Sequence, residues 1–457
     1  MKKWMPFLLM LTCMILFPSA SFAASSGLPF SYKTEVKVRL LQKPAFSATL
    51  TGTYSVMDLN GNAIIPLNGQ TALSFQQQNG QITLTSGTEV FTSPAGFAVY
   101  ETTVSDQNAF KLTGMETASG STDGTMTFRG SFTVKPGKDR PLVLNVLDME
   151  NYLKGVVPSE MPASWHTEAV KAQAVAARGY AYTDLEKSNV LEMTTIHQVY
   201  LGKTKEHANS NKAVMDTAGV YVTYNGKPVK TYFYSSSGGK TEHAEDVWGN
   251  AVPYIHSVQD NFDRHPGNTH YGWEKSVPTS TIAQKLQLPS TQMLLGLQVA
   301  TRTEGGNAKQ VTATIYDKSS KQTSTKELLG TSAKYPDAYR SLFGGLKSSK
   351  FSVSSNSSSS IMNGSGATEK TGHLIGYKIQ KADGTTEYIE DINIQVRTKE
   401  GSSLLPTYPT NFSFKGDGYG HRTGLSQWGA RGMAEAGHSY DAILKHYYTG
   451  IEVKKLY

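Results

Sequence analysis

The hydrophobic pattern changes its period once along the chain, near Asp148, and this change limits the possible folds more than any other feature. Before it, short runs of alternating apolar and polar residues recur, such as residues 34–40, and turn signals such as Asn60-Gly61 separate them. After it, apolar residues recur at steps of three and four, as in residues 149–156. We therefore expect an α+β protein in which a β-rich N-terminal region precedes a mixed domain.

Two helices are expected directly after the change of period. Asp148 is a suitable N-cap for the first helix, which Pro158 should end, and Ser164 could cap a longer helix that runs to about Lys187. A stretch rich in Ser, Asn and Gly, from Ser352 to Gly366, should form a flexible surface insert. Further strands are expected at 220–224, 229–234, 375–379 and 392–396, and helices near the C-terminus.

The first 24 residues have the pattern of a secretory signal. Lys2 and Lys3 precede an apolar run over residues 7–17, and Ser21-Phe22-Ala23 is a small-x-small cleavage site. The apolar run is too short to cross a bilayer comfortably, which disfavours an uncleaved anchor, and no later segment approaches ~20 unbroken apolar residues. We expect cleavage after Ala23 and a secreted protein that touches the membrane only where this segment stays uncleaved.

Cysteine use excludes several kinds of site. The single cysteine, Cys13, lies in the signal segment, so the mature chain can form no disulfide, iron–sulfur cluster or thiolate zinc site and has no Cys nucleophile. His197, His207 and His243 do not have the spacing of metal ligands. We therefore expect neither a metal nor a cofactor.

The charge balance narrows the range of partners. The formal net charge is +7, and loss of Lys2 and Lys3 leaves +5. A mildly basic exported protein suits an anionic polymer such as the bacterial wall, although the same charge could serve solubility alone. No run of Lys and Arg and no basic patch interleaved with aromatic residues indicates a nucleic-acid partner.

One carboxylate has neighbours suited to acid–base chemistry. Glu160 lies between Pro158 and Pro162, and because proline fixes φ we expect Glu160 on a rigid loop between two helices. Apolar neighbours such as Val157 and Trp165 would raise the pKa of its carboxyl group, so that it holds a proton near neutral pH. A general acid that acts on a glycosidic oxygen needs such a group. The alternative is a glutamate that only caps a helix or forms a salt bridge.

Seven ordered blocks of sequence carry a family resemblance. They read YLKGVVPSEMPASW (152–165), EAVKAQAVAARGY (168–180), QVYLG (198–202), YSSSGGKT (234–241), the weaker LKSSKF (346–351), GDGYGHRTGLSQWGA (416–430) and ILKHYYTG (443–450). Through these blocks, residues 142–260 and 340–457 resemble the SpoIID/LytB family, whose members include sporulation stage II protein D and proteins described as amidase enhancers. Together with the signal pattern, the alternating runs and the Ser/Asn/Gly-rich stretch, the resemblance divides the chain into a signal segment (1–23), a β-rich region (24–135) and a SpoIID-like, cell wall-associated domain (136–457) with an insert near 352–370.

The resemblance implies a lytic transglycosylase with Glu160 as its catalytic acid/base. Such an enzyme cleaves peptidoglycan glycan strands stripped of stem peptides and leaves 1,6-anhydromuramyl ends. One carboxylate is enough because the attacking group is the C6 hydroxyl of the sugar itself, so no second carboxylate has to activate water. The family members described as amidase enhancers leave a second possibility open, a non-catalytic module that holds glycan or stimulates a wall amidase.

Further site residues follow from the same resemblance. Arg178 could orient Glu160 or bind a sugar substituent, and Tyr200 and Trp428 could stack on sugars or belong to the core. His421 could donate a hydrogen bond or be structural. The residues implied to line or support the site, besides Glu160, are Arg178, Gln198, Tyr200, His421, Ser426 and Gln427.

The sequence also departs from the family pattern. Arg422 and Leu425 stand where family members commonly have Gly and Met, and Gly179 stands where Thr is usual. We expect the Arg422 cation to alter glycan contacts or weaken catalysis. A third reading, a serine hydrolase that uses Ser426 or the serines at 235–237, lacks the Gly-x-Ser-x-Gly elbow.

Overall fold

The computed structural model describes residues 28–457 except 68, 70, 116–123, 329–336, 363–364, 382 and 399–400. The expected signal segment lies outside the described residues, so cleavage after Ala23 stays a prediction. The chain divides into two units, one that ends at Met149 and one from Glu150 to Tyr457. The first unit therefore extends past residue 135, where we expected the β-rich region to end. The strand Leu142–Asp148 pairs with two strands of the first unit and belongs to it.

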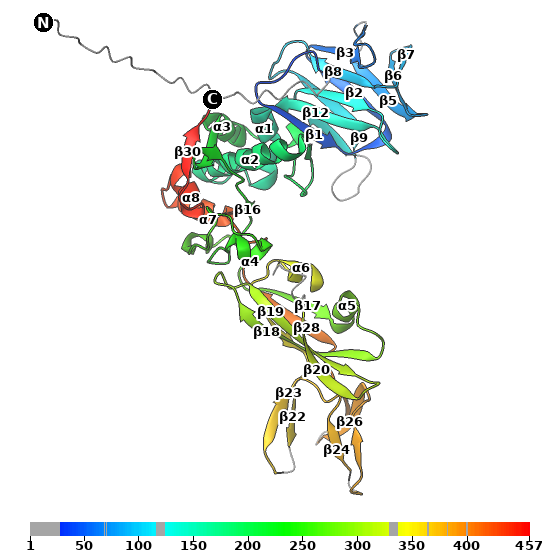
Figure 1. Cartoon of the computed structure of the whole chain (residues 1–457), viewed down its shortest axis with the longest axis vertical. Coiled ribbons are helices and arrows are strands. Elements are labelled where there is room, and N and C mark those ends of the chain that lie inside the picture. The colour runs from blue at the N-terminus through cyan, green and yellow to red at the C-terminus, as the bar shows by residue number, and fades with distance from the viewer. Residues whose placement is uncertain are drawn as a thin grey trace, which may run out of the picture. The chain divides into compact units, whose positions relative to one another are not determined.

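The first unit consists of two antiparallel sheets, which Figure 1 shows facing each other. One sheet contains the order β1-β12-β11-β8-β3-β4, and the other has the order β10-β9-β2-β5-β6-β7. Aromatic rings join the two sheets, since Phe132 on β11 packs against Phe75 on β5 and Phe110 on β9, with ring centroids 5.9 and 4.5 Å apart. The bounds are β1 Glu35–Leu40, β2 Gln42–Thr51, β3 Tyr54–Asp58, β4 Ile64–Ile65, β5 Ala72–Gln78, β6 Gln81–Ser86, β7 Glu89–Ser93, β8 Phe97–Glu101, β9 Ala109–Met115, β10 Gly124–Phe128, β11 Ser131–Lys135 and β12 Leu142–Asp148.

Period-two alternation accounts for these strands. In β1, Val36, Val38 and Leu40 are buried while the residues between them are partly or fully exposed. Successive side chains on a strand point to opposite faces, so one face fills the interior of the sandwich and the other meets solvent. The expectation of a β-rich N-terminal region is confirmed, and the chain as a whole is an α+β protein.

The second unit begins with helices. The first helix, α1 (Met149–Glu160), contains Pro158 and continues past it, so Glu160 is its last residue and does not lie on a loop. Proline is compatible with helical φ and removes only one backbone donor, and the Met161 N–H still bonds to the Val157 carbonyl at 2.9 Å. The second helix, α2 (Thr167–Ser188), is capped by His166, two residues after the expected cap at Ser164.

Short elements complete the helical part of this unit. The parallel pair β16 and β29 brings the segment before residue 235 beside the start of α7. The C-terminal helix α8 is capped by Ser439 and buries Ile443, Leu444 and Tyr447. The bounds are β13 Leu191–Glu192, η1 Gly202–Lys205, α3 Ala208–Asp216, β14 Val220–Tyr224, β15 Lys227–Pro228, β16 Phe233–Tyr234, α4 Ala244–Trp248, η2 Asn261–Asp263, β29 Leu425–Ser426, α7 Gln427–Glu435, α8 Tyr440–Tyr447 and β30 Glu452–Lys455.

A β-rich part lies between α4 and α7 in the sequence. It contains the sheets β17-β28-β21 and β18-β19-β20 and the hairpins β22–β23, β24–β25 and β26–β27. The bounds are β17 Trp273–Pro278, α5 Thr279–Lys285, β18 Gln292–Arg302, β19 Ala308–Asp317, β20 Gln322–Glu327, α6 Ala338–Leu342, β21 Phe351–Ser355, β22 Ser359–Met362, β23 Thr368–Thr371, β24 Lys378–Gln380, β25 Thr386–Tyr388, β26 Asn393–Thr398, β27 Gly401–Pro406 and β28 Asn411–Gly416.

The stretch from Ser352 to Gly366 differs from the expected flexible insert. Residues 352–355 belong to β21, which pairs with β28, and residues 359–362 form β22, which pairs with β23. The strand partner of β21 lies about sixty residues further along the chain (Ser352 pairs with Lys415), so local composition gave no sign of it.

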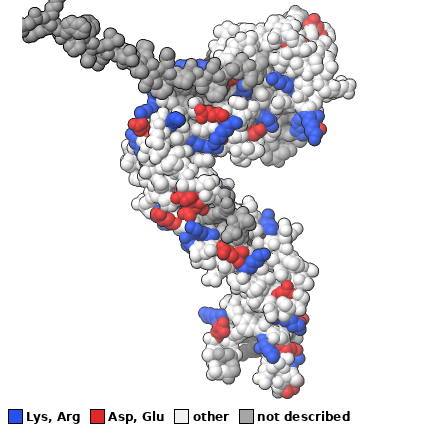
Figure 2. Space-filling model, viewed as in Figure 1, with Lys and Arg blue, Asp and Glu red and all other residues white. Residues whose placement is uncertain are grey.

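Charged side chains of both signs are interspersed over the face that Figure 2 shows, without a large patch of one sign. Among the described residues, no helix combines the length and apolarity needed to cross a membrane.

Candidate functional site

Glu160 ends α1 with its side chain half-buried. Its Oε1 accepts a hydrogen bond from the Val199 N–H at 2.8 Å. Burial raises the pKa of the Glu160 carboxyl group above its usual value, and the Val199 N–H opposes this by stabilising the carboxylate. The C-terminal end of a helix carries partial negative charge, which also disfavours an ionised carboxylate there. The result is a carboxyl group suited to hold a proton and to release it again.

A hydrogen-bonded pair of glutamine side chains lies at the end of α1. Gln427, the first residue of α7, donates through Nε2 to the Glu160 carbonyl at 3.0 Å and to Oε1 of Gln173 on α2 at 3.2 Å. The Nε2 of Gln173 is buried and has no hydrogen-bond partner among the described residues. Segments distant in the sequence therefore meet at Glu160, and a buried amide donor close by is unused.

Four half-buried rings contact one another in sequence and form an aromatic row: Tyr180, Tyr232, Trp248 and His421. Burial raises the pKa of the Tyr180 hydroxyl on α2, and the charge of Asp184 adds to this effect. The Tyr180 ring meets Tyr232 edge-on, with centroids 5.9 Å apart. Tyr232 packs on Trp248 at 4.3 Å, and Trp248 lies 5.4 Å from the His421 ring.

A second aromatic pair lies on the two segments that follow Glu160 and Gln427. The rings of Trp165 and Trp428 are 4.7 Å apart, and the Arg431 guanidinium lies 5.1 Å from both ring centroids. All three side chains are half-buried. Such rings offer flat apolar surfaces with a cation beside them.

Arg178 does not reach Glu160. It is fully buried, and its Nε and Nη2 donate to the two carboxylate oxygens of Glu150 at 3.0 and 2.6 Å. Its Nη1 donates to the Val220 carbonyl at 3.1 Å. Glu150 lies in the first turn of α1, about 15 Å from Glu160 at 1.5 Å of rise per residue. The expectation that Arg178 orients Glu160 or binds sugar is therefore wrong, because its donors are committed to the core.

Tyr200 and Gln198 pack against α1. Tyr200 is buried and packs on Tyr152 at 5.2 Å, and a Cβ on Gly155 would lie 2.7 Å from the Tyr200 ring. Gln198 is also buried and donates to the Tyr152 hydroxyl at 3.4 Å. Of the two roles left open for Tyr200, stacking on sugar or core, the structure shows core. These residues hold Val199 in place for its bond to Glu160.

His421 is half-buried among aromatic rings. Its Nε2 donates to the Phe233 carbonyl at 3.1 Å, and its Nδ1 accepts from the Thr423 N–H at 3.2 Å. Burial lowers the pKa of His421 to about 4, so the ring is neutral at physiological pH. Because both ring nitrogens bond to the backbone, the His421 ring is fixed in place and has a structural role in the aromatic row.

Ser426 caps a helix. Its Oγ donates to Oδ1 of Asp263 at 2.7 Å and accepts from the Gly429 N–H at 3.2 Å. Asp263 also accepts from the Ser236 hydroxyl at 2.8 Å. Ser236, Ser237 and Ser426 are fully buried, so their hydroxyls are not exposed to a substrate, and the structure gives no support to the serine-hydrolase reading.

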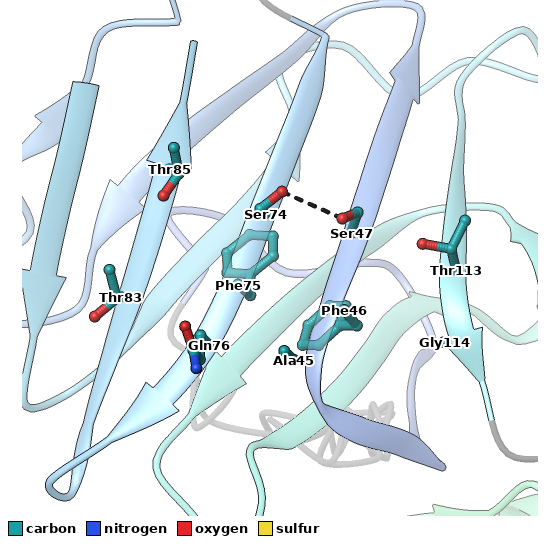
Figure 3. Close-up of a pocket in the computed structure, with 10 residues that line it drawn as sticks. All are labelled: Ala45, Phe46, Ser47, Ser74, Phe75, Gln76, Thr83, Thr85, Thr113 and Gly114. Atoms are coloured by element: carbon teal, nitrogen blue, oxygen red, sulfur yellow. Dashed lines mark hydrogen bonds between the residues drawn. The ribbon is translucent and has the colours of Figure 1, made fainter. Parts of the chain in front are cut away.

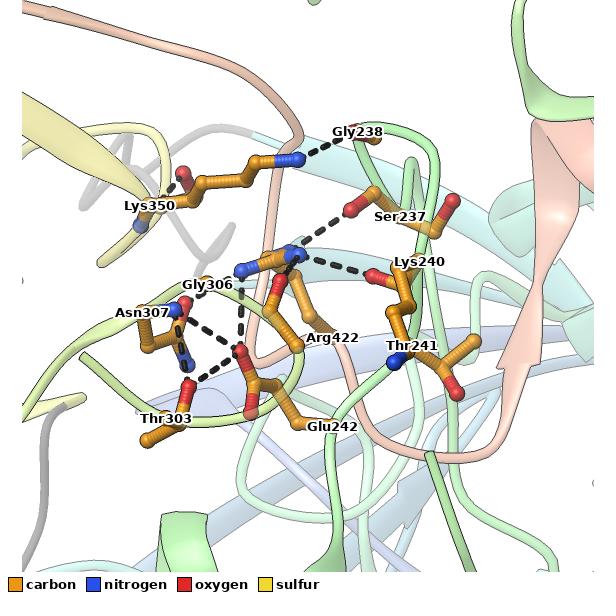
Figure 4. Close-up of polar contacts among 12 residues, drawn as sticks. Ser237, Gly238, Lys240, Thr241, Glu242, Thr303, Gly306, Asn307, Lys350 and Arg422 are labelled. Atoms are coloured by element: carbon orange, nitrogen blue, oxygen red, sulfur yellow. Dashed lines mark hydrogen bonds and ion pairs between the residues drawn. The ribbon is translucent and has the colours of Figure 1, made fainter. Parts of the chain in front are cut away.

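Arg422 is likewise structural. It is fully buried, and Figure 4 shows its guanidinium between three loops. It donates to the carbonyls of Ser237, Lys240 and Gly305, each at 2.7 Å, and pairs with Glu242 at 3.1 Å. The expected effect of a free cation on glycan contacts is therefore not supported, because these acceptors occupy the guanidinium.

Sequence reasoning missed several residues at the site. Gln173 and Tyr180 lie in a quoted block but carried no assigned role, and Val199 acts through its backbone, which no side-chain motif reveals. Asp263 lies outside every block and gave no signal.

Within the part of the chain that the structure describes, no group of three His, Cys, Asp or Glu side chains could hold a metal ion.

Fold and site together define an α+β protein in which the half-buried carboxyl group of Glu160 ends a helix and half-buried aromatic rings lie on the segments that follow it. Residues 138–224, which include Glu160, match the family model SpoIID, described as stage II sporulation protein. The amidase enhancer of Bacillus subtilis (strain 168) is 34% identical over 311 residues, which are 65% of this chain and 39% of that protein. An uncharacterised protein of Brachyspira hyodysenteriae is 31% identical over 74% of this chain and 75% of its own length. Stage II sporulation protein D of Bacillus amyloliquefaciens is 29% identical over 68% of this chain and 75% of that protein.

The chain belongs to the SpoIID family. It spans about two fifths of the amidase enhancer and three quarters of the other two relatives.

Proposed function

We propose that this protein acts on the glycan strands of the bacterial cell wall as an exported lytic transglycosylase, with Glu160 as its acid/base. The observation that carries the proposal is the environment of Glu160, a half-buried carboxyl group with a raised pKa and one oxygen held by a backbone N–H. The chain belongs to a family whose members include sporulation proteins and an amidase enhancer.

The proposed reaction needs only this one carboxyl group. Protonated Glu160 donates its proton to the glycosidic oxygen, and the bond from C1 to that oxygen breaks. The carboxylate then removes the proton of the C6 hydroxyl while O6 attacks C1, which closes the 1,6-anhydro ring and restores the acid. No water enters the products.

The half-buried aromatic rings of α2, of α7 and of the segment that follows Glu160 suit a sugar chain. Sugar rings stack their apolar faces on aromatic surfaces, and half-buried Tyr180 and Trp428 each offer one. Arg431 lies beside the two tryptophans and gives its Nε to Glu435 at 2.7 Å, and its terminal nitrogens would bind the lactyl carboxylate of a muramyl residue.

Mass spectrometry of products from purified peptide-free glycan tests the proposal. Wild-type protein should yield 1,6-anhydromuramyl ends, and Glu160→Gln should yield none. Glu245→Gln, an exposed change on α4, is the matched control and should behave as wild type.

A second candidate function is the stimulation of a wall amidase, favoured by the relative that is named for this property. It predicts that wild-type protein gives no anhydro ends but raises the rate at which a wall amidase releases stem peptides, and that Glu160→Gln keeps this effect.

A further inference from the structure

The first unit carries a hollow on the outer face of the sheet β10-β9-β2-β5-β6-β7. Its volume is about 340 Å³. The polar side chains that line it are Ser47, Ser74, Gln76, Thr83, Thr85 and Thr113. Figure 3 shows them on neighbouring strands, with Ser47 and Ser74 pointing toward each other. Phe46 and Phe75 lie at its floor and are buried.

Strand register sets the hydroxyl groups in a row. Thr125 pairs with Thr113, Thr113 with Ser47, Ser47 with Ser74, and Ser74 with Thr85. One hydroxyl thus comes from each of five adjacent strands, which are spaced about 4.8 Å apart. In the next row, Gln76 pairs with Thr83.

A bulge opens the sheet at this place. Between β2 and β9 the register jumps from Gln42 opposite Met115 to Ser47 opposite Thr113, which leaves Gly114 against four residues of β2. Gly114 has φ of 78° and lines the hollow. Bulges bend the strand and interrupt pairing, so the backbone contributes to the shape of the hollow.

The polar groups of the hollow are available to a ligand. The hydroxyls of Ser47 and Ser74 bond to each other at 3.2 Å, and each keeps further bonding capacity. Within the described residues, the side chains of Gln76, Thr83, Thr85 and Thr113 make no hydrogen bond to the protein.

We propose that this hollow binds an uncharged, β-linked N-acetylhexosamine chain, as a site separate from Glu160. No charged residue lines the hollow, which disfavours an anionic polymer. An extended peptide would pair with the backbone of an edge strand and not with this face. The spacing between hydroxyl groups in the row, which is the spacing between strands, is close to the length of one pyranose ring. The Gln76 amide can also pair with an acetamido group, through one donor and one acceptor.

The absence of cysteine from the chain after Ala23 allows a site-specific test. Ser74→Cys and Ala72→Cys are made separately in the chain from Ala24, with Glu160→Gln to prevent turnover of the probe. Both positions are exposed on β5, and Ala72 lies outside the hollow. The probe is the hexamer of β-1,4-linked N-acetylglucosamine, and the readout is the rate of thiol alkylation.

The hexamer should slow alkylation of the Ser74→Cys thiol severalfold and saturably, and leave that of Ala72→Cys unchanged. Adding Thr83→Glu to the Ser74→Cys chain should raise the half-protecting concentration, because a carboxylate then stands in the hollow without a cation. An unchanged Ser74→Cys rate at hexamer concentrations up to its solubility, or equal slowing at both positions, would overturn the proposal. Neither outcome affects the Glu160 proposal, which is judged by anhydro products.

Discussion

At the scale of single residues, the carboxyl group of Glu160 is governed by opposing contributions. Burial and the C-terminal end of α1 favour its protonated form, and the Val199 N–H favours the carboxylate. Both forms are needed in turn by the proposed reaction. The balance between them, set by a backbone donor 39 residues away in sequence, should appear directly in the pH dependence of the rate.

Val199→Pro removes the N–H that stabilises the Glu160 carboxylate, so the pKa of Glu160 should rise further. The protonated acid then persists to higher pH, and the high-pH limb of the profile of kcat/KM for glycan cleavage should move to higher pH. Val199→Ala keeps the N–H and is the matched control. An unmoved limb in a folded Val199→Pro protein would show that this hydrogen bond does not tune the acid.

Arg178→Gln should lower stability and leave substrate affinity alone. Removal of one partner from a buried ion pair typically costs about 3–5 kcal/mol, because the other charge stays buried without compensation. Urea unfolding of this variant, beside the exposed change Lys187→Gln on the same helix, measures the loss. Unchanged stability with a raised KM would instead assign Arg178 to sugar binding.

At the scale of elements, α2 shows what could and could not be predicted. Its apolar face follows from spacing alone, but the helix also packs closely on the segment before β16. A Cβ on Gly179 would lie 2.6 Å from Oγ1 of Thr231 and 2.9 Å from the Val229 carbonyl. The departure from the family at this position therefore has a steric reason that only the folded chain reveals.

Sequence reasoning located the elements around Glu160 better than it assigned roles to side chains. The alternating pattern predicted the β-rich region, and the helical spacing predicted both α1 and α2, because local periodicity reports which face is buried. Arg178 pairs with Glu150 and Arg422 pairs with Glu242. Neither glutamate is close to its arginine in sequence, and neither belongs to a recognised motif. Motif matching therefore found the residues and could not say which way they face.

The hairpin β22–β23 should be dispensable for folding, unlike β21 directly before it. Its two strands pair with each other and are largely exposed, whereas Phe351 in β21 is buried against Phe343 and Phe414. Replacing residues 358–371 with a short glycine linker should barely change the melting temperature. Phe351→Ala should cost about 3–5 kcal/mol in the free energy of unfolding. A large loss from the hairpin deletion would contradict this division.

At the scale of the whole molecule, the two units serve separate proposed roles. The second holds the carboxyl group and the aromatic rings proposed to act on wall glycan, and the first holds the hydroxyl-lined hollow proposed to bind an uncharged N-acetylhexosamine chain. Each role has its own readout. Both presuppose export to the wall, which rests on the first 24 residues.

N-terminal sequencing of protein recovered from the culture medium or the wall fraction tests export. The mature chain should begin at Ala24, because Ser21-Phe22-Ala23 fits a signal-peptidase site. Recovery of full-length chain in the membrane fraction alone would show that the segment acts as an anchor.

The yield of 1,6-anhydromuramyl ends from peptide-free glycan, compared between wild type and Glu160→Gln, tests the central claim most directly. A general acid/base typically contributes ~10²–10⁴ in rate, so the substitution should reduce the yield by at least that factor. The fold and the binding of glycan should persist, because glutamine has nearly the same size and its oxygen can still accept the Val199 N–H bond. Equal yields from the two proteins, or none from wild type that binds glycan saturably, would contradict the assignment of Glu160 as the catalytic acid.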